Sequence, residues 1–188
     1  MINGIGNVLQ NCKGVVITIN GNNNRIVIGK NTIVHCSITI TGNNCDVIIG
    51  DNSTFRSGSI VIEGDKCRYR QGVLSGIREA RFVIQENNSK IHIGDDCMLS
   101  HNIVVRTSDS HSILDLNGNR INPAKSVFIG NHVWIAEAAI ILKGVHIGNN
   151  SIIGYGSICT KDIPSNSIAT GVPAKVVKEN VNWSNKLL

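Results

Sequence analysis

Between Ile129 and Cys159 the chain places a small or medium apolar residue at every sixth position. These residues are Ile129, Ile135, Ile141, Ile147, Ile153 and Cys159. An α-helix repeats after about 3.6 residues and a strand after about two, so neither element produces this period. A hexapeptide repeat is typical of a parallel β-helix, in which each hexad forms one side of a triangular coil.

The residues between these positions predict a narrow interior with regular corners. A second compact residue follows each of the first five apolar positions by four places, at Val133, Ala139, Val145, Ser151 and Ser157. Gly130-Asn131-His132 and Gly148-Asn149-Asn150 are eighteen residues apart, which is one full coil of three hexads. Because glycine and asparagine tolerate left-handed backbone, we expect corners at both segments.

The same pattern begins near the N-terminus with a longer period. The segment 17–32 recurs 21 residues later as 38–53. We therefore expect two stacked coils with about three extra residues at one corner, which a solenoid tolerates because each repeat contacts only its neighbours. Looser coils are expected around residues 61–62 and 91–96.

Residues 106–126 break the repeat, because they are polar and contain Pro123. We expect the segment from Ile93 through Leu99 to Val105 to stack on the coil that resumes at Ile129. The intervening residues then form a loop extruded from the coil. Long loops in compact scaffolds are usually functional, so candidate chemistry is sought there first.

Composition favours one elongated domain over residues 1–188. An aromatic content of 4% and 19 glycines fit thin coils filled by Ile, Val and Cys. No apolar run approaches the roughly 20 residues of a membrane span, and residues 1–14 lack the features of a signal peptide, which predicts a cytoplasmic protein. A net charge of +5 without a basic cluster interleaved with aromatics disfavours nucleic acid but suits anionic ligands.

The six cysteines contain no CxxC pair and no metal-ligand spacing. Several fall at positions where the coil requires small apolar side chains. We therefore expect reduced structural thiols and no metal site.

Six short segments resemble a known family. Residues 107–113 (TSDSHSI), 121–125 (INPAK) and 129–135 (IGNHVWI) resemble the active-site stretch of hexapeptide-repeat acyltransferases, and the resemblance extends over about residues 93–178. Residues 153–157, 160–164 and 171–175 resemble that family's coenzyme A segment. The arrangement is most similar to surface-polysaccharide O-acetyltransferases. It implies an all-β, left-handed parallel β-helix with one extruded loop at about 106–126 and a short C-terminal tail.

His111 matches the family's catalytic histidine. Imidazole is the side chain whose ordinary pKa lies closest to neutrality, so it suits the removal of a proton from an acceptor hydroxyl. The alternative, without the resemblance, is an exposed loop histidine. Asp109, less readily Asp115, or a backbone carbonyl could hold the other ring nitrogen. His101, in the last hexad before the loop, is a distant second candidate for the base.

Trp134 is expected to point outward, because residues 133 and 135 take inward positions. We interpret it as a wall of the acceptor or acetyl pocket, with packing under the 106–126 loop as the alternative. Nothing in the sequence assigns a comparable role to Trp183 in the tail.

The resemblance assigns coenzyme binding to Ala136, Tyr155, Thr160, Lys161, Lys175 and Lys178. Ala136 replaces the family's usual glycine, and Tyr155 replaces a small residue.

The resemblance therefore implies a homotrimeric O-acetyltransferase with active sites between subunits. It would move an acetyl group from acetyl-CoA directly to a carbohydrate hydroxyl of a capsular or lipopolysaccharide glycan. An acetyltransferase of amino sugars or of streptogramin-type antibiotics is the alternative, and a non-catalytic polysaccharide-binding solenoid is a weaker one. Zinc hydratases of related fold are disfavoured, because no two histidines have the five-residue spacing of their ligands.

Overall fold

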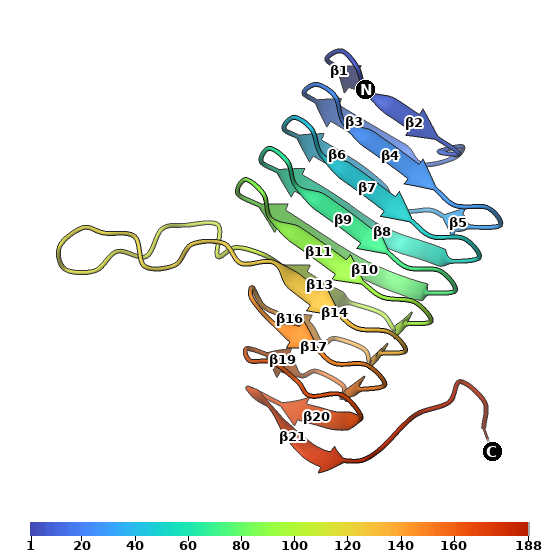
Figure 1. The fold of residues 1–188 in the computed structure, drawn as a ribbon, viewed down its shortest axis with the longest axis vertical. Coiled ribbons are helices and arrows are strands. Elements are labelled where there is room, and N and C mark those ends of the chain that lie inside the picture. The colour runs from blue at the N-terminus through green and yellow to red at the C-terminus, as the bar shows by residue number, and fades with distance from the viewer. Residues whose placement is uncertain (188) are drawn as a thin grey trace.

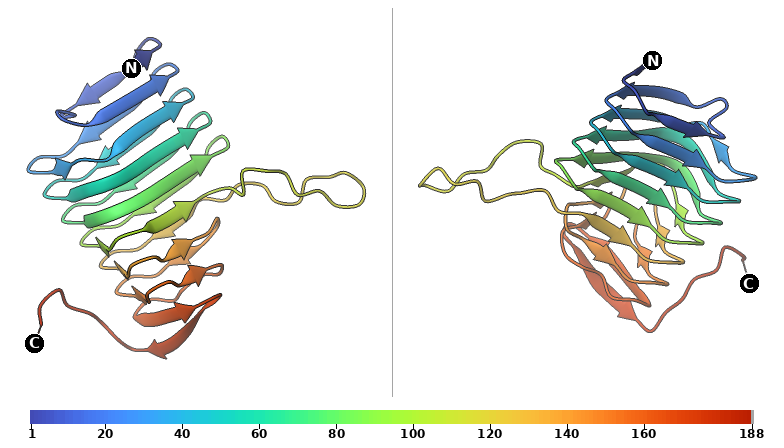
Figure 2. Two further views of the ribbon diagram at one scale, coloured as in Figure 1. Left: turned by 180° about the vertical axis from the view of Figure 1, so that it is seen from behind. Right: turned by 45° about the horizontal axis from the view of Figure 1, so that its top comes forward.

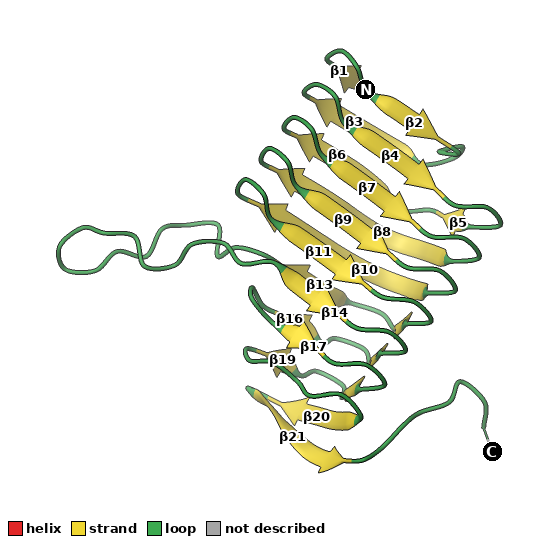
Figure 3. Ribbon diagram, viewed as in Figure 1, coloured by secondary structure: helices red, strands yellow, loops and turns green. Residues whose placement is uncertain are grey.

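The computed structural model describes residues 1–187, and within this range the chain is all-β, without a helix (Figures 1 and 3). The strands wind around one axis, and each pairs in parallel with strands one coil away, except for an antiparallel pair at the C-terminal end. The chain is thus the parallel β-helix that the hexad spacing predicts, of the left-handed kind that the family resemblance implies. Figure 2 shows the coils stacked in register along the whole length.

One face of the coil is a seven-stranded parallel sheet. Its strands are β2 (Val8–Gln10), β4 (Arg25–Ile28), β7 (Asp46–Ile49), β9 (Arg68–Gln71), β11 (Lys90–Ile93), β14 (Val127–Ile129) and β17 (His146–Ile147). It is called the first face below, and its middle strands lie toward the viewer in Figure 1.

The remaining strands form a 14-stranded sheet that covers the other two faces. Its main path consists of β1 (Ile2–Asn3), β3 (Val16–Asn20), β6 (Ser37–Thr41), β8 (Thr54–Glu63), β10 (Gly76–Gln85), β12 (Met98–Leu99), β15 (Trp134–Ile135), β18 (Ile152–Ile153), β20 (Ser167–Gly171) and β21 (Ala174–Glu179). Off this path lie β5 (Ile33–Val34), β13 (Ile103–Arg106), β16 (Ile140–Ile141) and β19 (Ile158–Cys159). The long strands β8 and β10 pass around a corner and so join the two faces.

The predicted stacking on either side of the loop is confirmed. Ile93 pairs with Ile129, Leu99 with Ile135, and Val105 with Ile141. The repeat stops at Arg106, the last residue of β13, and resumes at Val127, the first of β14. The extruded loop therefore has the predicted bounds, and it extends far from the coil in every view (Figures 1 and 2).

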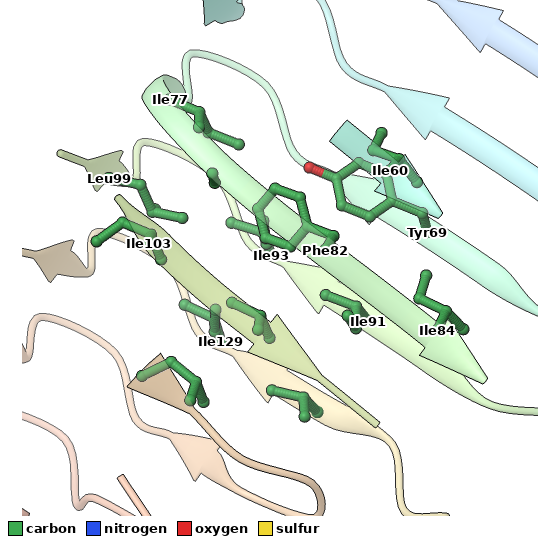
Figure 4. Packing of buried hydrophobic residues seen from close by; sticks show 14 of the residues in the cluster. Ile60, Tyr69, Ile77, Phe82, Ile84, Ile91, Ile93, Leu99, Ile103 and Ile129 are labelled. Atoms are coloured by element: carbon green, nitrogen blue, oxygen red, sulfur yellow. The ribbon is translucent and has the colours of Figure 1, made fainter. Parts of the chain in front are cut away.

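The hexad positions form the core. All six residues of the first apolar set are buried, and the second set of five is equally buried. The wider N-terminal coils also enclose aromatic side chains, which the expectation of coils filled by Ile, Val and Cys missed. Tyr69 and Phe82 lie with ring centroids 5.0 Å apart (Figure 4). Phe55 meets Phe82 edge-on at 5.6 Å.

The corners follow the expected positions, but the left-handed backbone falls on different residues. His132 and Asn150 have positive φ of 52° and 60°, whereas Gly130 and Gly148 do not. Glycine is required there for a close approach instead, because a Cβ on Gly130 would collide with Asn149 of the next coil. The segments are therefore corners, as predicted, for a partly different reason.

The longer N-terminal period comes from one corner. The buried positions Ile28, Val34 and Ile40 are six residues apart, but Ile49 follows Ile40 by nine. The three extra residues fall in the turn at 42–45, between β6 and β7. The extruded loop leaves the coil at the same corner, where the turn after β10 would otherwise recur. This corner is therefore the part of the scaffold that accepts insertions.

The cysteines agree with the expectation of structural thiols. All six are free, and five are buried. Burial raises the pKa of Cys36 and Cys159 to about 12 each, so both thiols stay protonated at neutral pH. Among residues 1–187 there is no helix long and apolar enough to cross a membrane.

Candidate active site

The loop of residues 107–126 carries His111 and is an irregular hairpin. Its arms pair at an isolated backbone bridge between Leu114 and Arg120, and at its base the Lys125 N–H donates to the Thr107 carbonyl at 2.9 Å. Near the tip, Asp115 accepts hydrogen bonds from the backbone N–H groups of Asn117 and Asn119, both at 2.9 Å. Those bonds, with that from Asn119 foremost, lower the pKa of Asp115. Asp115 therefore closes the tip of the loop.

Glu86 fastens the loop to the corner of the preceding coil. Its two carboxylate oxygens accept hydrogen bonds from the Arg120 guanidinium at 2.6 and 2.7 Å, and Ser108 Oγ donates to it at 2.7 Å. The hydrogen bonds from Arg120 lower the pKa of Glu86 to about 2. A two-pronged Arg–carboxylate pair fixes orientation as well as distance, so the base of the loop is held in one geometry.

Asn122 fixes the backbone on both sides of His111. Its side chain is 7% exposed and uses both ends of the amide. Oδ1 accepts the Ile113 N–H at 2.7 Å, while Nδ2 donates to the His111 carbonyl and to Asp109 Oδ2, both at 2.8 Å. The His111 side chain itself is exposed. A rigid backbone thus presents a solvent-accessible imidazole.

Asp109 is held by groups other than the His111 ring. Its Oδ2 accepts hydrogen bonds from Lys143 Nζ at 2.5 Å and from Asn122, and these two partners, Lys143 first, lower its pKa. In the described part of the chain neither Asp109 nor Asp115 bonds to the His111 imidazole. The expectation that Asp109 orients that ring therefore stays a prediction. Its visible contacts tie the loop to Lys143, one coil away.

Trp134 points outward from β15, as predicted, and is 36% exposed. It lies on the face formed by β12, β15 and β18, whereas the loop leaves from the corner between β13 and β14. The tail covers part of it, because the Trp183 ring lies 6.1 Å from the Trp134 ring. The neighbour of Trp134 is therefore the tail and not its own loop.

Trp183 is a residue that sequence reasoning missed. Its ring stacks on His132 at 4.2 Å, and its Nε1–H donates to the His132 carbonyl at 2.8 Å. His132 Nδ1 lies 2.8 Å from Asp96 Oδ2. A tryptophan outside the hexad pattern has no periodicity that would reveal this contact. His101, the second candidate base, is exposed at the corner between β12 and β13, away from the loop.

Four of the six predicted coenzyme residues lie at two corners that border β13, β16 and β19. At one corner, Ala136 is followed by the turn at 137–139, and the exposed Tyr155 lies one coil further on. At the other, Thr160 and Lys161 follow β19, one coil after Lys143. Lys175 and Lys178 are on β21, opposite Thr170 and Ile168.

Lys161, Lys175 and Lys178 are exposed to solvent. No carboxylate within residues 1–187 forms an ion pair with any of the three lysines just described. Exposed, unpaired ammonium groups are suited to binding the phosphates of a nucleotide. The arrangement therefore offers exposed cations on the coils that follow the loop, and a tethered imidazole on the loop itself.

Comparison with protein families agrees with these features. Residues 126–161 match the family described as bacterial transferase hexapeptide (six repeats). The polysialic acid O-acetyltransferase of Neisseria meningitidis is 39% identical over 173 residues, which are 91% of this chain and 80% of that protein. The enzyme of the same name from Escherichia coli O1:K1 / APEC is 37% identical over 106 residues, 56% of this chain but only 34% of the relative.

Solved structures show the same likeness. The polySia-specific acetyltransferase NeuO superimposes with a TM-score of 0.87 at 35% identity, covering 98% of this chain and 87% of that one. A galactoside acetyltransferase in complex with coenzyme A gives a TM-score of 0.50 at 32% identity, covering 61% of this chain and 56% of that one.

Proposed function

The chain belongs to the hexapeptide-repeat O-acetyltransferases, and from that premise we propose that it moves an acetyl group from acetyl-CoA to a hydroxyl of a capsular or lipopolysaccharide glycan. The full-length likeness to proteins named for polysialic acid supports a capsular acceptor. The coenzyme A in the galactoside acetyltransferase complex supports acetyl-CoA as the acetyl donor.

The observation that carries the proposal is the exposed imidazole of His111 on a backbone fixed by Asn122. In the proposed reaction, His111 Nε2 takes the proton of the acceptor hydroxyl as the oxygen attacks the thioester carbonyl. The carbon–sulfur bond then breaks, and the imidazolium returns the proton to the departing thiolate. The acetyl group passes directly from sulfur to oxygen, and no acyl-enzyme forms.

Acetyl-CoA brings a pyrophosphate, a 3′-phosphate and a pantetheine arm. We assign the phosphates to Lys161, Lys175 and Lys178, whose charges are unpaired, and the arm to the corner of Ala136 and Tyr155. Thr160 adds a hydroxyl donor beside Lys161. These side chains bind and orient the donor, so that its carbonyl can meet the acceptor oxygen held at His111.

The active site would be completed by a second copy of the chain. The loop projects away from its own coil (Figures 1 and 2). Trp134 lies on a different face, on β15. We propose a homotrimer in which the loop reaches a neighbouring subunit, because a closed ring gives every loop an equivalent partner. His111 of one copy would then act beside Trp134 of the next.

Mass spectrometry of glycans incubated with the protein and acetyl-CoA tests the activity. The panel should hold polysialic acid, neutral capsular and lipopolysaccharide glycans, an amino sugar and a streptogramin. We expect acetyl esters on a capsular or lipopolysaccharide glycan. Acetylation of only the amino sugar or the antibiotic, or of none of the panel, would overturn the proposal.

A further inference from the structure

The first face carries a column of outward cations in its N-terminal half. Arg25 of β4 pairs in register with Asp46 of β7, Asp46 with Arg68 of β9, and Arg68 with Lys90 of β11. Arg70 stands beside Arg68, two residues further along β9. Since neighbouring strands are about 4.8 Å apart, the side chains are spaced at a regular short interval along the coil axis. We call Arg25, Arg68, Arg70 and Lys90 the basic column.

The basic column has more positive charge than its neighbours neutralise. Asp46 is the acidic residue among those lining the hollow on this face, and it lies 3.0 Å from Arg25 Nε and 3.7 Å from Arg68 Nε. Four cations and one carboxylate leave a net charge of about +3 at neutral pH. In the described residues neither Arg70 nor Lys90 has an ion-pair partner. The column is thus free to attract an anion.

A hollow of about 380 Å³ runs beneath these side chains. Besides the column, Ile48, His92 and Phe128 line it. Burial, followed by the charge of Arg70, lowers the pKa of His92, so this imidazole is neutral at neutral pH. The hollow therefore combines cationic walls with uncharged ring surfaces, which is a suitable lining for an acidic sugar.

The basic column leads to the loop that carries His111. Lys90 N–H donates to Ser126 Oγ at 3.0 Å, and Ser126 is the residue before β14. The next residue, Ile91, pairs with Val127, the first residue of β14. Figure 1 shows β4, β7, β9 and β11 side by side on one face, with the loop leaving the coil at β14. The column and the loop are therefore continuous.

We propose that the basic column binds the acceptor as an anionic polysaccharide and guides it toward His111, an inference that rests on the proposed function. Cations on three of four successive coils, with Asp46 on the other, match a polymer that repeats its own negative charge. A single small anion would use one or two of them. The coenzyme lysines lie on later coils, after β19 and on β21, so the column is not needed for the acetyl donor.

Equilibrium binding to the His111→Ala protein tests this without turnover. The probes are α2,8-linked polysialic acid, neutral dextran of similar length and single-stranded DNA. We expect polysialic acid to bind, with an affinity that falls as salt is raised. Adding Arg68→Ala and Arg70→Ala should weaken that binding about tenfold or more. Arg56→Ala, an exposed arginine on β8, is the matched control and should change little.

Three binding results would overturn the inference: equal affinity for dextran, tight binding of DNA but not of polysialic acid, or unchanged binding in the Arg68/Arg70 double variant. Unchanged melting temperatures would show that the double variant remains folded. Restored binding in Arg68→Lys with Arg70→Lys would support a role of charge.

Kinetics of the His111-containing enzyme separate this inference from the proposed function. The Arg68/Arg70 double variant should raise the KM for long polysialic acid about tenfold, with the KM for acetyl-CoA and the kcat for a short sialic acid oligomer unchanged. If the double variant transfers acetyl groups with unchanged kinetics, the inference about the basic column is overturned but the proposed function is not. Binding through the column without any acetyl transfer would overturn the proposed function instead.

Discussion

Asn122 links three parts of the His111 loop through one buried amide. It accepts the Ile113 N–H and donates to the His111 carbonyl and to Asp109. Residues 121–125 (INPAK) belong to the family resemblance, but the sequence did not predict a role for Asn122 within them. That role depends on a fold-back of the loop that has no periodic pattern.

Replacing Asn122 by Asp tests the positioning of His111. The variant keeps an acceptor for Ile113 but loses both donors and sets a second carboxylate beside Asp109. We expect kcat to fall between about 10-fold and 10²-fold, because small misplacements of a catalytic group are costly. The KM for acetyl-CoA should not change. Asn117→Ala, in the exposed tip, is the control, and an equal loss there would argue against a specific role.

His111 is the residue on which the chemistry depends most. His111→Ala should lower the rate of acetyl transfer about 10²-fold to 10⁴-fold, the usual effect of losing a general base. Acetyl-CoA binding, measured by calorimetry, should persist, since the assigned donor contacts lie elsewhere. Full activity in the variant would refute the assignment of the base.

Lys161 tests the assignment of the coenzyme. Lys161→Gln should raise the KM for acetyl-CoA about three- to tenfold, with a smaller effect on kcat, because the phosphates are remote from the reacting carbonyl. Acetyl-pantetheine, which lacks the nucleotide, should be used equally well by both proteins. Lys13→Gln, an exposed lysine in the first coils, is the control. Equal weakening of both thioesters would place the coenzyme elsewhere.

At the scale of elements, the extruded loop is tied to the coil by two ionic contacts, Glu86 with Arg120 and Asp109 with Lys143. The sequence alone gave the bounds of this loop, because hexad spacing stops and resumes at definite residues. It could not give the ties, since they join residues 34 positions apart. The hexad period predicts which side chains point into the coil, but it does not predict which charged surface side chains form ion pairs.

The Glu86 contact predicts how the loop responds to acid. The pKa of Glu86 is about 2 in the folded chain and about 4.3 in an unfolded one. A lowered folded-state pKa means that the contact stabilises the loop fully above about pH 4.3, and that this stabilisation is lost as pH falls toward 2. Hydrogen exchange at Ile113 and Ile121 should therefore accelerate in that window beyond its intrinsic pH dependence.

Glu86→Gln provides the comparison for the acid response. Its loop should exchange quickly at every pH, because the charged partner of Arg120 is missing. Identical exchange profiles for the wild type and the variant would mean that Glu86 does not hold the loop.

At the scale of the whole molecule, the coil separates His111 from Trp134. One is on a loop that projects from the corner between β13 and β14, and the other is on the face formed by β12, β15 and β18. The hexad pattern predicted that both would be outward, but it could not predict that the C-terminal tail brings Trp183 against Trp134. A solenoid fixes neighbours along its axis, whereas contacts of its tail and loop depend on side chains outside the repeat.

The most direct test is acetyl transfer to polysialic acid by trimers co-expressed from His111→Ala and Trp134→Ala chains. Each variant alone should be nearly inactive. If each site takes His111 from one chain and Trp134 from the next, random mixing at equal amounts leaves about a quarter of the sites with both residues intact, and about a quarter of wild-type activity should return. No recovery in mixed trimers, or full activity in His111→Ala trimers, would contradict a site shared between subunits with His111 as its base.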